Sequence, residues 1–142
     1  VIDQEMSLFD PERVSLDGPP FTLSPKASIS LAMLVHELAT NAVKYGAWSV
    51  PAGRVRISWT IIPHDDRPED LEIVWLESDG PPAAEPSRSG FGTQVVISHA
   101  QAVFWGAVTT EYGEKGFRWK LVAPLTAFTG DPTEEGDGEK AG

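Results

Sequence analysis

The sequence predicts an α/β fold, a two-layer α/β sandwich in which a mixed sheet carries its helices on one face. Several short segments alternate apolar and polar residues, as strands with one buried face do. Two longer segments, 24–46 and 93–105, contain residues that favour helix. The order along the chain is strands, helix, two strands, loop, helix and two strands, which indicates helices packed against one sheet.

The composition fits one folded domain and excludes several classes of protein. The chain has 142 residues, 41% of them hydrophobic, and five Trp, which suffices for a single core. It contains no Cys, so it has neither disulfides nor thiolate chemistry. Its formal net charge is −10 without a basic stripe, which argues against nucleic acid as a partner. The longest apolar run in the first half, "LAMLV", is too short for a membrane segment. The absence of Cys suits a cytoplasmic protein, so a cytoplasmic location is expected.

Both ends of the chain are expected to lie outside the folded domain, which we place at residues 12–127. Residues 1–11 show no decisive pattern and are interpreted as a linker from an upstream domain. Residues 128–142 are predicted to be a disordered acidic tail. The part "DPTEEGDGEKAG" carries five acidic residues and one Lys, a composition that does not support a packed core.

The first predicted elements lie between residues 13 and 46. The runs "RVSLDG" and "FTLS" are separated by the turn sequence "DGPP", and they indicate either two strands or one strand and a connection. A helix is then predicted, with Ser24 as its N-cap and Pro25 as its first residue. It continues for about six turns to Gly46, a residue type that commonly ends helices.

The second half of the chain predicts four more strands and another helix. Strands at 53–63 and 70–78 are joined by the polar hairpin loop "HDDRPED", and Ile73, Trp75 and Glu77 share one face of the second strand. The Pro- and Gly-rich segment 79–92 is a loop, and a helix follows at 93–105. The runs 106–113 and 116–125 predict a hairpin that closes the sheet.

The first predicted helix carries polar residues beside its apolar face. Glu37, Asn41 and Lys44 are spaced i, i+4, i+7 and therefore form one stripe. An Asn oxygen is a hard, neutral ligand for Mg²⁺, a Glu can hold a metal-bound water or accept a proton, and a Lys can bind phosphate. The stripe therefore indicates a site for a metal–nucleotide complex. The same spacing fits a solvated ladder of hydrogen bonds, and spacing alone leaves both interpretations open.

Three motifs in order carry a resemblance to a known family. The stretch "HELATNAVKYGA" (36–47) resembles the N box of sensor histidine kinases, and "WLE" (75–77) resembles the W-x-E motif of their HWE family, which also has a His in the N box. The stretch "SGFGTQVV" (89–96) resembles the second glycine box. The resemblance spans residues 13–125 and implies the catalytic ATP-binding domain of such a kinase, with the histidine-kinase-type ATPase (Bergerat) fold of the GHKL ATPase superfamily.

The resemblance also implies roles for the matching residues. Asn41 would be the Mg²⁺ ligand, and Glu37 the catalytic general-base residue beside it. Lys44 would contact phosphate, and Tyr45 would flank the nucleoside. The carboxylate of Glu77 would accept a hydrogen bond from the adenine amino group, which would select ATP over GTP. The other residues expected to bind ATP are Asp79, Gly80, Arg88, Gly90, Phe91, Gly92 and Thr93.

Three further positions carry alternative interpretations. His36 marks the family, but it lies away from the Glu37 stripe, and packing with a hydrogen bond also explains it. Trp75 is a second family marker and is expected in the core. Asp79 stands where the family usually has glycine; if the position needs positive φ, Asp tolerates it better than most residues. A different register would make Asp79 the adenine carboxylate, but Trp75 fixes the spacing in favour of Glu77.

The reaction that the resemblance implies is transfer of the γ-phosphate of magnesium ATP to a histidine and then to a response-regulator aspartate. The three histidines are His36, His64 and His99, and none lies in a helical hairpin upstream of the N box, where the family keeps its acceptor. The expected partners are therefore ATP, an upstream dimerisation and phosphoacceptor domain of the same protein, and a response regulator. The isolated chain is expected to bind ATP without autophosphorylating. An anti-sigma-factor-type serine kinase and a degenerate docking module that has lost ATP remain alternatives.

Overall fold

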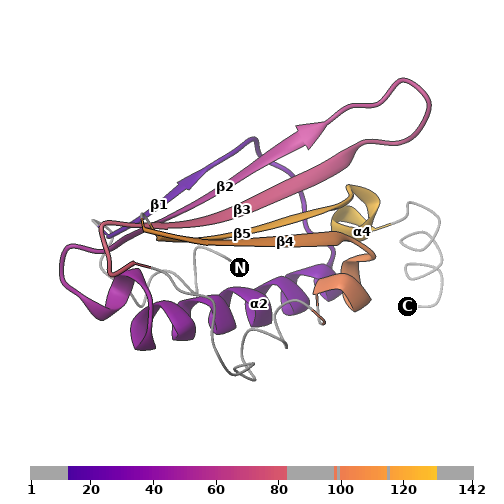
Figure 1. Ribbon diagram of the computed structural model, residues 1–142. Helices are drawn as coiled ribbons and strands as arrows, with labels where there is room; N and C mark the ends of the chain where they lie inside the picture. Colours follow the sequence, from indigo (N-terminus) through magenta and orange to yellow (C-terminus); the bar gives the residue numbers. More distant parts are fainter. Residues whose placement is uncertain (1–12, 83–97, 99, 115, 131–142) are drawn as a thin grey trace.

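A five-stranded sheet covered on one face by a long helix forms the two layers of the fold (Figure 1). The computed structural model describes residues 13–82, 98, 100–114 and 116–130. The long helix, α2 (Pro25–Lys44), runs along the underside of the sheet in this view. The predicted α/β sandwich is confirmed.

The sheet is mixed, as predicted, and its strand order is β1-β2-β3-β5-β4. The first strand, β1 (Val14–Asp17), runs parallel to β2 (Arg54–Ile62) at one edge. Strand β2 then pairs antiparallel with β3 (Asp70–Ser78). Residues 18–24 form no strand, so the segment before α2 is one strand and a connection.

The other half of the sheet is the predicted hairpin. Strand β4 (Ala107–Gly113) pairs antiparallel with β5 (Gly116–Pro124), and β5 also pairs antiparallel with β3. In this register Trp75 of β3 lies opposite Trp119 of β5. Strands β3 and β5 therefore pair at the centre of the sheet, over α2.

Helix α2 begins and packs as its sequence predicts. The hydroxyl of Ser24 accepts a hydrogen bond from the backbone N–H of Ala27 at 3.1 Å, and Pro25 takes the first position, where its missing N–H costs nothing. The helix ends at Lys44, and Tyr45 caps it. Its buried residues, which face the sheet, are Ala27, Leu31, Leu34, Val35, Leu38, Ala39 and Ala42.

The core lies between α2 and the alternating apolar residues of the sheet. The predicted inward face of β3 is confirmed, because Ile73, Trp75 and Glu77 are buried whereas Val74 is half-buried and Leu76 is exposed. Burial of each large side chain contributes about 2 kcal/mol. This face therefore fixes how α2 lies on the sheet.

The C-terminal end of the fold corrects the predicted boundary at residue 127. Helix α4 (Thr126–Thr129) contains Phe128, whose ring is fully buried and stacks on Phe104 with centroids 4.5 Å apart. The folded domain therefore continues at least to Gly130. Residues 1–12, which include the whole predicted linker 1–11, and residues 131–142, the rest of the predicted tail, lie outside the described residues.

The predicted helix at 93–105 is only partly described. Residues 100–104 are helical, but Trp105 lies beyond the helix end with a φ of 54° and an exposed ring, so the predicted end is wrong by one residue. Residues 93–97 and His99 lie outside the described part of the chain. Among the described helices, none has the length and apolar character needed to cross a membrane.

Candidate functional site

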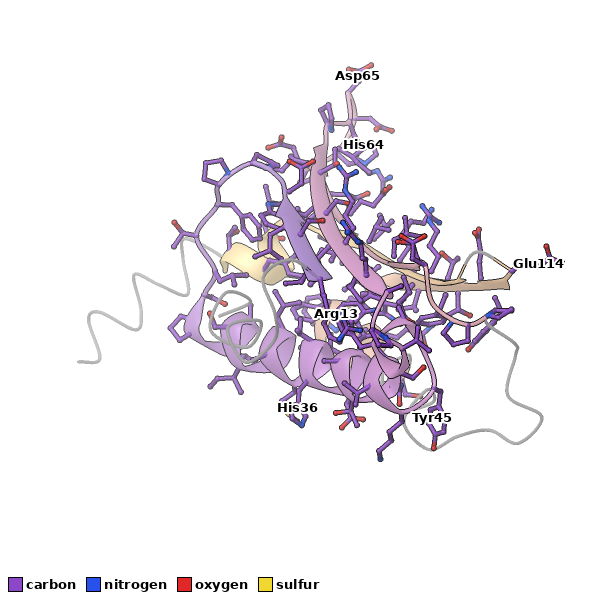
Figure 2. The ribbon with its side chains drawn as sticks, turned by 90° about the vertical axis from the view of Figure 1, so that its left-hand side faces the viewer. Arg13, His36, Tyr45, His64, Asp65 and Glu114 are labelled. Atoms are coloured by element: carbon purple, nitrogen blue, oxygen red, sulfur yellow. The ribbon has the colours of Figure 1, made fainter. Side chains whose placement is uncertain are left out.

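The second half of α2 carries the predicted metal and phosphate residues. Glu37 and Asn41 are half-buried, which places them at the rim of the apolar face. Lys44 is exposed, and so is Tyr45, at 77% of its surface. Figure 2 shows His36 and Tyr45 on the outer side of the helix, pointing away from the sheet. The predicted stripe thus runs from the edge of the core at Glu37 out to solvent at Lys44.

A tight turn follows the helix and holds the backbone close to Asn41. The N–H groups of Tyr45 and Gly46 both donate to the carbonyl oxygen of Asn41, at 2.8 and 3.1 Å. The chain then enters the short helix η2 (Ala47–Ser49). The guanidinium of Arg13 donates to the carbonyl oxygens of Val50 and Gly53, at 2.6 and 3.1 Å, and so ties the end of this turn to the start of β1.

The carboxylate of Glu77 lies buried at the end of β3 and accepts two hydrogen bonds. Oε1 accepts from the backbone N–H of Ala47 and Oε2 from the indole Nε1 of Trp75, each at 2.9 Å. Burial raises the pKa of Glu77 above its ordinary value, and the hydrogen bonds from Trp75 and Ala47 oppose the rise. Glu77 is only 4% exposed, and through Ala47 it joins β3 to the turn after α2.

Two glycines make room for this junction. A Cβ atom on Gly46 would overlap Oε1 of Glu77, and one on Gly80 would lie 2.5 Å from the Cα of Ala47. Gly46 follows the helix cap as predicted, but its φ of −106° is open to any residue. Glycine is therefore required there because the Glu77 carboxylate leaves no room for a side chain, and not because of the backbone conformation. Gly80 therefore packs against the same turn that begins at Asn41.

The position of Asp79 explains why glycine is the usual residue there. Asp79 has a φ of 58°, in the left-handed region that residues with a side chain avoid. Position 79 therefore does require positive φ, which is the case in which Asp is tolerated better than most residues. Asp79 is exposed, whereas Glu77 is buried and faces the turn, which agrees with the register that assigns the inward carboxylate to Glu77.

The structure thus brings together the N-box turn and the W-x-E strand. The sequence did not indicate Ala47, because this residue contributes its backbone N–H, a group that almost every residue type has. Nor did it indicate the reason for Gly46, which was interpreted only as a helix stop. The predicted residues of the second glycine box, namely Arg88, Gly90, Phe91, Gly92 and Thr93, lie outside the described residues.

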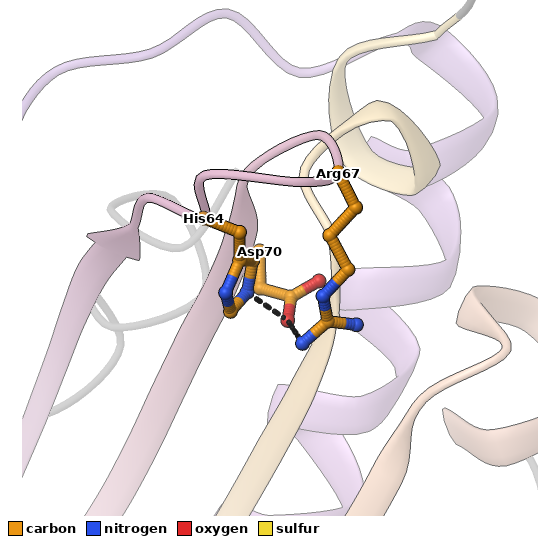
Figure 3. A network of polar contacts seen from close by, with 3 residues as sticks. All are labelled: His64, Arg67 and Asp70. Atoms are coloured by element: carbon orange, nitrogen blue, oxygen red, sulfur yellow. Dashed lines mark hydrogen bonds and ion pairs between the residues drawn. The ribbon is translucent and has the colours of Figure 1, made fainter.

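A separate polar network lies at the far end of β3. The carboxylate of Asp70 is paired with Nε2 of His64 at 2.9 Å and with the guanidinium of Arg67 at 3.4 Å (Figure 3). Both partners come from the loop between β2 and β3, which projects from the body of the fold (Figures 1 and 2). Asp70 is the first residue of β3, and Glu77 lies near the other end of this strand. The network around Asp70 therefore belongs to the β2–β3 hairpin and not to the candidate site.

The donor set at the candidate site fits a magnesium–nucleotide complex. Within the described ranges, no group of three His, Cys, Asp or Glu side chains could hold a metal alone. Magnesium needs fewer, since it binds through one or two protein oxygens together with substrate phosphates and waters. Asn41 and Glu37 offer such oxygens from the helix rim. The missing side chain of Gly46 leaves room for the buried carboxylate of Glu77, and that of Gly80 leaves room for the backbone of Ala47.

Comparison with known proteins finds relatives that are histidine kinases. No family model matches the chain. The chain is 38% identical over 117 residues to blue-light-activated histidine kinase 1 of Erythrobacter litoralis, across 80% of this chain and 31% of that protein. It spans between 23% and 31% of the length of the first curated relatives that it matches.

Solved structures of histidine kinases share the fold. The histidine kinase domain of the Erythrobacter litoralis EL346 blue-light-activated histidine kinase superposes with a TM-score of 0.67 at 17% identity, covering 88% of this chain and 58% of that one. The catalytic domain of histidine kinase ThkA gives a TM-score of 0.62 at 15% identity, covering 87% and 90%. ThkA in complex with the response regulator protein TrrA gives 0.62 at 17% identity, covering 89% and 40%.

The sequence relationship and the shared fold point to the same family. The relative with 38% identity is a histidine kinase, and the ThkA catalytic domain is matched over nearly its whole length. The chain therefore belongs to the histidine kinase family, and its fold is that of the ThkA catalytic domain.

Proposed function

We propose that this chain binds magnesium ATP where the end of α2 meets the end of β3. We further propose that, in the whole protein, it transfers the γ-phosphate to a histidine of a dimerisation domain, from which an aspartate of a response regulator receives it. The His of the N box and the W-x-E motif assign it to the HWE branch of the sensor histidine kinases. The relatives support this reaction, and ThkA forms a complex with a response regulator.

One observation carries the proposal: the buried carboxylate of Glu77 is bonded to Ala47, directly after the turn that carries Asn41 and Lys44. This hydrogen bond joins residues 30 apart in the sequence, one from each motif, and so supports a single site made from both motifs. Its parts are chemically those of a nucleotide site, with a buried acceptor at one end and an oxygen ligand and an ammonium group at the other. A solvated ladder of side chains on α2 would not require this junction.

Each side chain then has a defined task. Asn41 would hold the magnesium ion, which neutralises phosphate charge when bound, and Glu37 would orient a water or accept a proton beside it. Lys44 extends from the exposed end of the stripe and would meet a phosphate oxygen as a point charge. Glu77 would accept the hydrogen bond of the adenine amino group. Phosphoryl transfer depends mainly on such positioning and charge neutralisation.

Titration calorimetry with magnesium ATP tests the proposal. The wild-type chain is expected to bind in the micromolar to sub-millimolar range, and Asn41→Ala is expected to abolish binding. The matched control is Thr40→Ala, on the adjacent residue, whose hydroxyl donates to the carbonyl oxygen of His36 within the helix. It should bind ATP as the wild type does. A folded wild-type protein that does not bind magnesium ATP would refute the proposal in favour of a docking module.

Labelled ATP tests the direction of transfer. His36 lies on the outer face of α2 and His64 is bonded to Asp70, so neither is presented by a dimerisation helix. We expect no acid-labile phosphate on the isolated chain and rapid labelling when a dimerisation domain with its acceptor histidine is supplied. Acid-labile phosphate that forms on the isolated chain and disappears in His36→Gln would contradict the assignment of the acceptor to another domain.

A further inference from the structure

The W-x-E motif is a hydrogen-bonded pair. Trp75 and Glu77 are two residues apart in β3, so their side chains leave the same face of the sheet. The indole N–H of Trp75 donates to Oε2 of Glu77 at 2.9 Å, and Trp75 is only 1% exposed. Indole nitrogen is a donor without acceptor capacity, so it pairs with a carboxylate and not with another donor. The spacing of the motif thus follows from the pleat of one strand.

The two donors fix the carboxylate as a fork. The Ala47 N–H holds Oε1 and the Trp75 indole holds Oε2, each at 2.9 Å. An ionised carboxylate offers about four acceptor positions, so about two remain. Removal of either donor would free the group to rotate. It would also leave less to oppose the burial that favours its protonated form.

Trp75 has an aromatic ring contact and a tryptophan as its cross-strand partner. The ring of Trp48 meets it edge to face, with centroids 5.7 Å apart and an interplanar angle of 78°. Trp119 lies opposite it on β5. Trp48 donates its own indole N–H elsewhere, to the carbonyl oxygen of Arg13 at 3.1 Å. The indole N–H groups of Trp75 and Trp48 therefore have different acceptors. Of these two groups, that of Trp75 donates to Glu77.

We propose that Trp75 is a positioning residue for base recognition: its indole N–H holds Glu77 so that the remaining lone pairs of the carboxylate accept from the 6-amino group of adenine. This inference rests on the proposed binding of ATP. Trp75 is buried in the core and acts through Glu77, without touching the nucleotide. The motif therefore sets the preference for a 6-amino purine over a 6-oxo purine.

The test compares magnesium ATP with magnesium ITP, which carries a carbonyl in place of the 6-amino group. Affinities of wild type and Trp75→Phe for both nucleotides are measured by titration calorimetry. The wild type is expected to prefer ATP, and Trp75→Phe is expected to lower the ratio of the two affinities by about tenfold, since a bond to a charged group is lost. The matched control is Trp48→Phe, which removes an equal volume and an indole N–H from the same cluster, and it should keep the wild-type ratio.

The outcomes separate this inference from the proposed function. Equal losses for ATP and ITP in Trp75→Phe would show a merely structural role and overturn the inference while ATP binding stands. A wild type that binds neither nucleotide would overturn both. If Trp75→Phe does not fold, the assigned indole N–H resonance of Trp75 in the wild type decides: saturation with ATP should shift it more than saturation with ITP, and equal shifts would overturn the inference.

Discussion

Glu77 occupies the space that a side chain on Gly46 would need. A Cβ atom on Gly46 would overlap Oε1 of Glu77, the oxygen that accepts the hydrogen bond of Ala47. The residue after the helix cap and the carboxylate at the end of β3 therefore have to be considered together. Glu77 can keep this position only because residue 46 has no side chain, and a side chain at position 46 would displace the Glu77 carboxylate.

Gly46→Ala is expected to weaken nucleotide binding and the fold together. The added methyl group overpacks a buried site and should lower the free energy of unfolding by about 1–3 kcal/mol, as measured by urea denaturation. Because Glu77 must move, the affinity for magnesium ATP should fall as well. Gly113→Ala is the control, since the nearest atom to its Cβ would be a backbone oxygen at 4.0 Å. A Gly46→Ala variant as stable as Gly113→Ala would contradict the junction.

Substitutions of Asp79 should reveal the strain of its positive φ. Asp79→Val is expected to be less stable than Asp79→Gly by about 1–2 kcal/mol, because only glycine adopts the left-handed region without steric cost. Urea denaturation of the two variants measures the difference. The same pair of substitutions at Asp66, an exposed loop residue whose φ is not positive, should show no such advantage for glycine. Equal stability of the two Asp79 variants would contradict the left-handed assignment.

The raised pKa of Glu77 predicts how its contribution to stability varies with pH. Below the ordinary value of 4.5 the group is protonated in both the folded and the unfolded state, and its contribution is fully present. As the pH rises from 4.5 through the folded-state pKa, the unfolded state loses its proton first, so the contribution is lost. The free energy of unfolding of the wild type minus that of Glu77→Gln should therefore decrease over this range and level off above it.

Urea denaturation of both proteins at several pH values measures that difference. The other carboxylates are common to both chains, so their effects largely cancel in the subtraction. A difference that increases with pH would show that the hydrogen bonds from Trp75 and Ala47 outweigh burial, which would reverse the sign of the pKa shift.

The network around Asp70 should stabilise the β2–β3 hairpin without affecting the candidate site. Asp70→Ala is expected to lower the free energy of unfolding by about 1–3 kcal/mol, because it removes the buried acceptor of His64. Arg67→Ala removes a largely exposed ion pair and should cost at most about 0.5 kcal/mol. Asp70 lies roughly 23 Å along β3 from Glu77, so magnesium ATP affinity should stay at the wild-type value in both variants. Calorimetry showing a large loss in folded Asp70→Ala would place the hairpin in the site.

The sequence by itself determined most elements, because the signals for them are local. Ser24 and Pro25 predict the start of α2, and the spacing of its apolar residues predicts the buried face. The alternation in β3 predicts that Trp75 and Glu77 point inward together. Periodicity and capping depend on residues a few positions apart, so they can be read without the fold.

Only the tertiary structure decided what the site residues do to one another. The bond from Ala47 to Glu77 joins residues 30 apart, and its donor is a backbone N–H with no sequence signal. The need for glycine at position 46 arises from that contact, and the burial of Phe128 arises from its stacking on Phe104. Such contacts depend on strand order and on how α2 lies across the sheet, which hydrophobic periodicity leaves open because it specifies faces and not neighbours.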